Sequence, residues 1–278
     1  MRITCETLNA VIEVPPRPER IVSLVSSATE ALFAMGCGER VVGVSTYCPR
    51  YVPNLQRPLV GDYLRVEEEQ LAQLEPDLVL VTTGVQRSLG LALLAQGYPV
   101  YALPLPTSLH GILENVNLLG GLVNEAKAAR RLMREWEEFF QGLRRRPLTR
   151  RPRVYVELWF GKHLRTVGAL SFVNDLIEAT GGENIFGADP RAYFVPDLEE
   201  VARLRPEVLL FHTEPEHPVA VPRLLKERGW HRWEPPPLVV ETSVERGRNI
   251  IHDGPSMMET ALWLHGLLAS WAASGENA

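Results

Sequence analysis

The chain has 278 residues, of which 45% are hydrophobic and 23% are charged, and its formal net charge is -5. This composition is typical of a soluble globular protein with enough residues for two α/β cores, and it gives no reason to expect nucleic acid or an anionic membrane as a partner. No apolar run reaches the roughly 20 residues that span a bilayer, so we expect no transmembrane segment.

The N-terminal part of the chain alternates predicted strands with predicted helices. Apolar runs indicate strands at 20–24, 41–45, 78–82 and 98–103. Ser27 stands three residues before Glu30, which is the spacing of a capping box, and predicts a helix that ends near Gly36. Another helix is expected around 86–96. Strands separated by helices imply a mostly parallel sheet.

One segment of the sequence occurs twice. Residues 69–81 read EQLAQLEPDLVLV and residues 199–211 read EEVARLRPEVLLF. Each copy predicts a helix, a proline that stops it and a continuous apolar strand. The same offset brings Tyr63 into register with Tyr193, and Glu69 with Glu199. Such a repeat predicts two related lobes, and paired lobes commonly hold a ligand.

A long helical stretch separates the two copies. Residues 107–146 are helical in character almost throughout, and 124–145 predict one helix roughly 33 Å long. It ends in the segment RRRPLTRRPR, where arginines favour a helix C-terminus and prolines break the helix. We therefore predict an N-terminal α/β lobe at 1–121, a connecting backbone helix at 122–147 and a C-terminal α/β lobe at 148–278.

The C-terminal lobe repeats the alternation of strands and helices. Strands are predicted at 153–159 and 237–242, and a helix near 170–180. A final helix is expected from about Pro255 to Trp271, with the proline in its first turn.

The sequence contains none of the common catalytic or nucleotide-binding motifs, and we expect a protein that is not an enzyme. The segment FHTEPEH (211–217) has metal-ligating residue types, but its prolines favour a surface loop. No resident metal or cofactor is expected. Three cysteines are too few for a disulfide framework; a Cys37–Cys48 bridge remains open, although free buried thiols are favoured.

Aromatic residues lie at the ends of predicted strands or just before the two copies of the repeat, in both lobes. They are Tyr47, Tyr63, Trp159, Phe160 and Tyr193. Any one of them could belong to a core, but together they suit a large, flat and partly polar ligand. His252 and Asp253 precede the last helix, where they either cap it or offer an imidazole and a carboxylate to a ligand.

Four stretches together resemble a known family. They are RIVSLVSSATEALFAMGCGERVVGVSTY (20–47), the L-x-x-L-x-P-[DE] entries at 71–77 and 201–207, TGGENIFG (180–187) and GPSMMETALWL (254–264). The chain resembles the helical-backbone (class III) solute-binding proteins of ABC importers, and within them the vitamin B12-binding, BtuF-like branch. The resemblance implies two Rossmann-like lobes with mostly parallel sheets joined by a single long rigid helix.

The resemblance also implies a function. A corrinoid (cobalamin or cobinamide) would lie in the cleft between the lobes, against Tyr47, Tyr63, Tyr193 and the Trp159–Phe160 pair. Glu69 and Glu199 match the acidic pair that docks on arginines of the ABC permease. Alternatives are haem or a ferric siderophore in the same cleft, and an intracellular corrinoid-handling protein or enzyme.

The resemblance implies an extracytoplasmic location, in the periplasm or cell envelope, and we expect a monomer. The N-terminus has no sustained apolar stretch of the kind that a secretory signal requires. Taken as a complete chain, the sequence would therefore be cytoplasmic.

Overall fold

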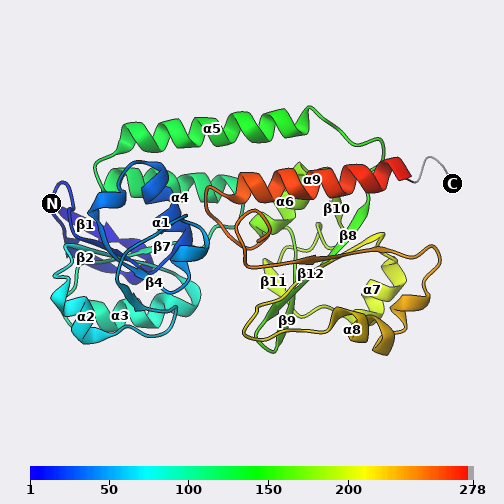
Figure 1. The fold of residues 1–278 in the computed structure, drawn as a ribbon, viewed down its shortest axis with the longest axis horizontal. Helices are drawn as coiled ribbons and strands as arrows, with labels where there is room; N and C mark the ends of the chain where they lie inside the picture. Colours follow the sequence, from blue (N-terminus) through cyan, green and yellow to red (C-terminus); the bar gives the residue numbers. More distant parts are fainter. Residues whose placement is uncertain (275–278) are drawn as a thin grey trace. The chain divides into compact units, whose positions relative to one another are not determined.

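The computed structural model describes residues 1–274, which divide into two compact units. Unit 1 contains Met1–Pro106, His110–Glu137 and Asp253–Pro255; unit 2 contains Thr107–Leu109, Glu138–His252 and the chain from Ser256 onward. Each unit has its own sheet flanked by helices (Figure 1), so the predicted α/β class is confirmed.

The main sheet of unit 1 is parallel throughout, in the order β5-β4-β3-β6-β7. Its strands are β3 (Ile21–Ser23), β4 (Val41–Ser45), β5 (Leu59–Gly61), β6 (Leu78–Thr82) and β7 (Val100–Leu103). A separate antiparallel hairpin, β1 (Arg2–Cys5) and β2 (Ala10–Glu13), precedes it and was not predicted.

Both faces of this sheet are buried, which explains why its strands read as continuous apolar runs. Ile21 and Leu80 pack on one face with helices α1 (Ser26–Ala34), α4 (Leu109–Leu122) and α5 (Ala126–Arg144). Val22 and Val79 pack on the opposite face with α2 (Glu68–Gln73) and α3 (Arg87–Ala95). Neighbouring residues of one strand therefore serve two separate cores.

Unit 2 has a mixed sheet in the order β11-β9-β8-β12-β13, and β10 pairs with β8. Its strands are β8 (Arg153–Phe160), β9 (His163–Val167), β10 (Glu183–Asn184), β11 (Tyr193–Phe194), β12 (Val208–His212) and β13 (Leu238–Thr242). Strands β8, β10, β12 and β13 are parallel, whereas β9 pairs antiparallel with β8 and β11. The antiparallel strands β9 and β11 and the short parallel strand β10 were not predicted from the sequence.

Four helices cover the sheet of unit 2: α6 (Phe172–Ala179), α7 (Leu198–Leu204), α8 (Val221–Glu227) and α9 (Met257–Ser274). Tyr155 and Phe211 pack with α7 and α8 in one core. The close approach of α6, β8 and α9 requires Gly182, because an added Cβ would lie 2.8 Å from Ile177, 2.9 Å from Val154 and 3.3 Å from Leu268.

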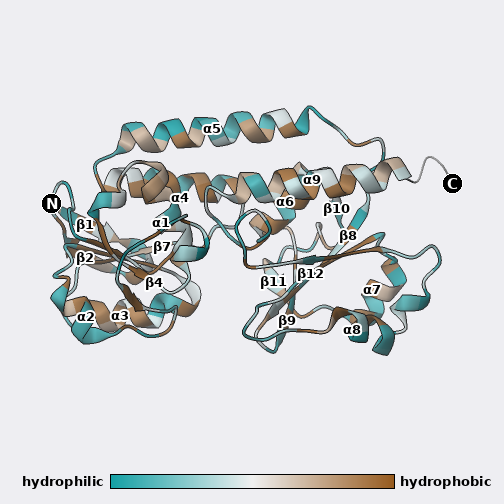
Figure 2. Ribbon diagram, in the orientation of Figure 1, coloured by the Kyte–Doolittle hydropathy of each residue, from teal (hydrophilic) through white to brown (hydrophobic). Residues whose placement is uncertain are grey.

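The long helix α5 contributes residues to both units and runs for 19 residues, or roughly 28 Å, which is somewhat shorter than expected. Its buried residues recur every three or four positions, at Ala129, Leu132, Trp136, Phe140 and Leu143. Figure 2 shows hydrophilic and hydrophobic residues alternating along it. This is the pattern of a helix with one covered face.

Two helix starts differ from the sequence prediction. Helix α1 begins at Ser26 after the N-cap Val25, so Ser27 lies within its first turn and makes no capping box. Helix α9 begins at Met257, so Pro255 lies before the helix and not in its first turn. Within residues 1–274, no helix combines the length and the apolar character needed to cross a membrane.

Candidate ligand-binding site

The predicted repeat is confirmed element by element. Strand β12 begins and ends 130 residues after β6, and both follow a short helix that ends in a left-handed residue, Glu75 (φ 42°) in one copy and Arg205 (φ 48°) in the other. Glu69 and Glu199 each occupy the second position of the preceding helix. The two copies therefore present equivalent positions on the two units.

In unit 1, two predicted site residues form one aromatic surface. Tyr47 follows β4 and Tyr63 follows β5, where the parallel strands end, and their rings stack with centroids 4.4 Å apart and planes 14° from parallel. The Arg50 guanidinium lies 5.0 Å from the Tyr47 centroid. The Tyr63 hydroxyl is 3.5 Å from Ser26 Oγ, and burial raises the pKa of this phenol. Tyr63 therefore stays protonated and neutral at physiological pH.

The turn that carries Tyr63 is specified by the residues before it. Gly61 has φ +151°, and a Cβ there would lie 2.1 Å from the Arg65 carbonyl oxygen, so only glycine fits. Asp62 Oδ1 accepts hydrogen bonds from the backbone N–H groups of Leu64 (2.6 Å) and Arg65 (2.9 Å). These contacts hold the tyrosine without using its own side chain.

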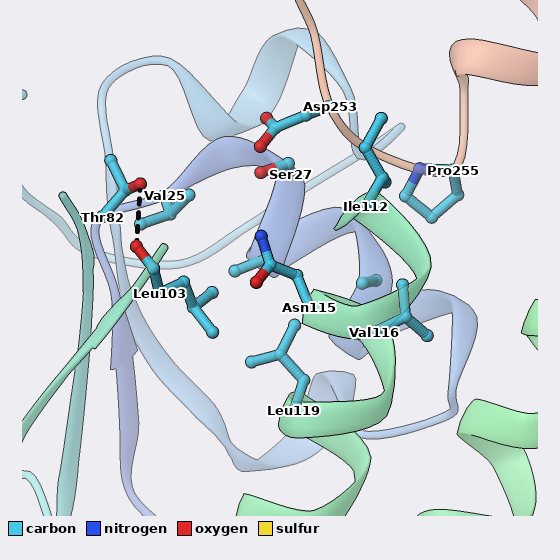
Figure 3. A pocket seen from close by; sticks show the side chains of 12 residues that line it. Val25, Ser27, Thr82, Leu103, Ile112, Asn115, Val116, Leu119, Asp253 and Pro255 are labelled. Carbon is cyan, nitrogen blue, oxygen red and sulfur yellow. Dashed lines mark hydrogen bonds between the residues drawn. The ribbon is translucent and has the colours of Figure 1, made fainter. Parts of the chain in front are cut away.

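Asp253 belongs to unit 1 and lines a small cavity there with Ser27, Thr82 and Asn115 (Figure 3). The cavity has a volume of about 10 Å³, close to that of one water molecule. Asn115 Nδ2 donates to the Pro104 carbonyl at 2.9 Å, while its buried Oδ1 has no hydrogen-bond partner within residues 1–274. Figure 3 shows the Asp253 carboxylate beside the Ser27 side chain.

In unit 2, a buried carboxylate fixes Trp159 at the end of β8. Glu157 is fully buried and accepts hydrogen bonds from Trp159 Nε1 (2.8 Å) and the Tyr155 hydroxyl (2.9 Å). Arg228 donates to both of its oxygens, at 2.7 and 3.1 Å. Burial, and then the adjacent charge of Glu157, raise the pKa of the Tyr155 phenol. The charge of Glu157 is thus balanced by a bidentate arginine.

A second aromatic group lies next to Trp159. The Phe160 and Tyr193 rings pack edge to face, with centroids 6.4 Å apart. Tyr193 is 38% exposed, and Val195, just beyond β11, is 63% exposed. Unit 2 therefore offers apolar surface from β8 and β11, as unit 1 does from the loops after β4 and β5.

Two histidines of unit 2, His212 and His252, are buried. His252 is buried, and His212 is fully buried at the end of β12 with its Nδ1 2.7 Å from Thr242 Oγ1. Burial lowers the pKa of His212 to about 4. The rest of FHTEPEH forms the predicted surface turn, closed by a hydrogen bond from His217 N to the Glu214 carbonyl. Across the described chain, no group of three metal-ligating side chains is arranged to hold an ion.

The acidic pair predicted to dock on a permease is exposed on both units. Glu69 and Glu199 have no ion-pair partner within the described part of the chain. Asp197 caps α7, the helix that carries Glu199, by accepting a hydrogen bond from Glu199 N at 2.9 Å. The three cysteines are free buried thiols, as the sequence favoured.

Sequence reasoning missed the residues that support the aromatic ones. Glu157 and Arg228 are far apart in the chain, and the only signal was a glutamate within the apolar strand RVYVELW. Such a residue in a buried strand needs a cation or several donors. Arg50 carried no signal, because its place beside Tyr47 depends on the turn after β4.

Comparison with known proteins matches this chain to ligand-binding proteins. Residues 21–234 match the family model described as periplasmic binding protein. A cobalamin-binding protein of Halobacterium salinarum is 32% identical over 198 residues, which is 69% of this chain and 53% of that protein. A vitamin B12-binding protein of Vibrio parahaemolyticus is 27% identical over 194 residues, covering 69% and 70% of the two chains.

Among solved structures, the apo form of the periplasmic heme-binding protein RhuT from Roseiflexus sp. RS-1 superposes with a TM-score of 0.74 at 25% identity. The match covers 91% of this chain and 99% of that one. The chain spans about half the length of the first curated relatives that it matches.

Proposed function

Since the chain belongs to the periplasmic binding protein family, we propose that it is the receptor of an ABC importer and that its ligand is a corrinoid, either cobalamin or cobinamide. The stacked Tyr47–Tyr63 pair at the end of a parallel sheet carries this proposal. The pair offers a flat apolar area bordered by hydroxyl groups, which suits a macrocycle with a polar rim. The names of the B12-binding relatives agree with it.

In this proposal the aromatic group of unit 2 offers a further surface for packing on a corrinoid. Tyr193 has an exposed ring for packing on the macrocycle, and Phe160 and Trp159 back it. Asp253 accepts hydrogen bonds from ligand amides, and the buried His252 holds the chain beside it. Aromatic packing on the macrocycle supplies most of the affinity, and this packing requires no metal coordination by the protein.

Haem is the second candidate, and it is supported by the similarity to the heme-binding RhuT. Protein phenols bind ferric iron as phenolates. The Tyr63 ring stacks on Tyr47 and its hydroxyl lies 3.5 Å from Ser26 Oγ, so we assign this residue to packing rather than to coordination. The corrinoid is favoured over haem or a ferric siderophore because the cobalamin- and vitamin B12-binding relatives match this chain in sequence and the Tyr47–Tyr63 surface suits packing on a macrocycle.

Delivery to a permease follows from the acidic pair. Glu69 and Glu199 sit at equivalent positions of two equivalent helices, exposed on their respective units. Two carboxylates of this kind complement paired basic patches on a partner. The proposal therefore assigns the chain to the cell envelope, as a non-catalytic monomer that hands its ligand to permease subunits.

A titration with cyanocobalamin, with haem run in parallel, tests the ligand. Quenching of tryptophan fluorescence should show saturable corrinoid binding in the micromolar range or tighter, with weaker haem binding. Haem binding alone, with a shifted Soret band, would replace the corrinoid by haem. Binding of neither would reject both ligands.

A further inference from the structure

A second cavity, of about 550 Å³, lies within unit 2. It opens where β8, β12 and β13 begin, which is the end of the parallel strands opposite to Phe160. Its charged and aromatic lining consists of Arg150, Arg153, Arg205, Glu207, Trp233 and Trp271, together with Glu234. A concave site of this size is in the range that holds small organic ligands.

Part of this lining is required by the fold, as the repeat shows. In unit 1, Arg20 Nε donates to the Leu74 carbonyl at 2.8 Å and Asp77 Oδ1 accepts from Arg20 N at 3.0 Å. In unit 2, Arg153 Nη2 donates to the Arg205 carbonyl at 2.8 Å, and Glu207 Oε2 accepts from Arg153 N at 3.0 Å. Each unit thus joins a helix end to a strand start with one arginine and one acid.

Arg205 differs from Arg153 and Glu207, because its side chain has no such structural role. The position of Arg205 is occupied in unit 1 by Glu75, with nearly the same backbone conformation, so the joint does not need a cation there. The Arg205 guanidinium lies 5.6 Å from the Trp233 centroid and makes no hydrogen bond within residues 1–274. Its donors are therefore available to a ligand.

Arg150 and Trp271 form another part of the cavity wall. Arg150 lies 4.2 Å from the Trp271 centroid and donates to Glu207 Oε1 at 2.7 Å. Three arginines face two glutamates in the lining, so the cavity keeps an excess of positive charge in a chain whose net charge is -5. Both tryptophans are half-buried, with ring area facing the cavity.

We propose that this cavity is a second binding site, and that it takes an organic carboxylate with a flat aromatic body. The carboxylate receives charge-assisted hydrogen bonds from Arg205, and the aromatic body packs on the two tryptophan rings. The site is separate from the corrinoid surface, because it lies at the opposite end of the strands of unit 2. It does not depend on the proposed import function.

The test uses 2-naphthoate as the probe and 2-naphthalenemethanol as its uncharged counterpart. The full chain is labelled with 5-fluorotryptophan, and its six tryptophan signals are assigned by single Trp→Phe variants and followed by ¹⁹F NMR. Naphthoate should shift the signals of Trp233 and Trp271 saturably, and leave those of Trp136 and Trp159 in place. The alcohol should bind at least about tenfold more weakly.

Arg205→Glu is the informative variant, because unit 1 tolerates a glutamate at the equivalent position. It should weaken naphthoate binding by about tenfold or more, and Arg205→Met, which removes only the charge, by a smaller factor. Arg248→Glu is the matched control, since Arg248 lies 4.7 Å from the Trp263 centroid outside the cavity. This control should bind naphthoate as the parent protein does.

Three results would overturn the proposal. One is the absence of a saturable shift at Trp233 and Trp271 up to about 10 mM naphthoate, which corresponds to very weak binding. Another is equal affinity for the alcohol and the carboxylate. The third is unchanged naphthoate affinity in both Arg205 variants.

Discussion

Replacing Arg228 with alanine should destabilise unit 2 strongly. The substitution removes both charge-assisted hydrogen bonds to Glu157, at 2.7 and 3.1 Å, and leaves that fully buried carboxylate with only the Trp159 and Tyr155 donors. Breaking a buried ion pair by removing one partner costs about 3–5 kcal/mol, because the remaining charge stays desolvated. The position of Trp159 depends on the same carboxylate.

Thermal unfolding measures this loss. A destabilisation of that size lowers Tm by roughly 6–20 °C in a protein of this size. Tryptophan fluorescence is a suitable reporter, because five of the six tryptophans belong to unit 2 and only Trp136 belongs to unit 1. Trp230, whose ring centroid is 4.9 Å from the Arg228 guanidinium, lies beside the substituted residue.

A paired variant separates lost charge balance from lost packing. Arg228→Met alone keeps most of the volume and leaves Glu157 uncompensated, whereas Arg228→Met combined with Glu157→Gln removes both charges, so the pair should recover at least half of the Tm that Arg228→Met loses. A Tm within about 2 °C of the parent for Arg228→Ala would refute the buried-charge reasoning. Equal destabilisation of Arg228→Met and of the paired variant would refute it as well.

The remaining predictions concern the ligand surface, pH and docking. Tyr193→Ala and Tyr63→Ala should each weaken cyanocobalamin binding by roughly 1–3 kcal/mol, because each removes a ring that packs on the macrocycle. Tyr63→Phe keeps the ring and should bind with an affinity near that of the parent protein. Unchanged affinity in the alanine variants would exclude these rings from the site. The pKa of His212 is about 4 in the folded protein and near 6.5 in the unfolded chain, so the unfolded chain binds more protons between these pH values. The free energy of unfolding should therefore fall by roughly 3 kcal/mol as the pH drops from about 6.5 to 4. Denaturant unfolding of His212→Gln should lack this acid-dependent loss; a parent-like profile would assign the loss to other groups. Glu69→Ala with Glu199→Ala should preserve ligand affinity and reduce ligand uptake through the permease, and a large loss of affinity would contradict the docking assignment.

Several features could be predicted from the sequence because local residues specify them. The repeated proline ends each helix, and the apolar runs LVLV and VLLF are buried on both faces, so β6 and β12 were located correctly. The alternation of these elements gave the α/β class, and the small number of cysteines gave free thiols. The position of Tyr47 after β4 followed from the same kind of boundary, whereas β5, which precedes Tyr63, and β11, which contains Tyr193, were not predicted.

Other features depended on residues far apart in the chain. Strands β9 and β11 form because β9 pairs with β8 and β11 pairs with β9, and not because of their own sequence. The start of α1 moved because Ser26 and Ser27 are buried in its first turn instead of capping it. Local propensity does not report such contacts.

The site shows the same division. Local sequence was enough to place Tyr47 after β4, Trp159 and Phe160 at the end of β8, and the two equivalent glutamates of the repeat, because these elements are encoded by nearby residues. Three contacts could be seen only in the folded chain: Tyr63 stacks on Tyr47, Arg228 neutralises Glu157, and Arg205 lies beside Trp233 at a cavity. Burial and charge balance at these places come from segments that meet only when the chain folds.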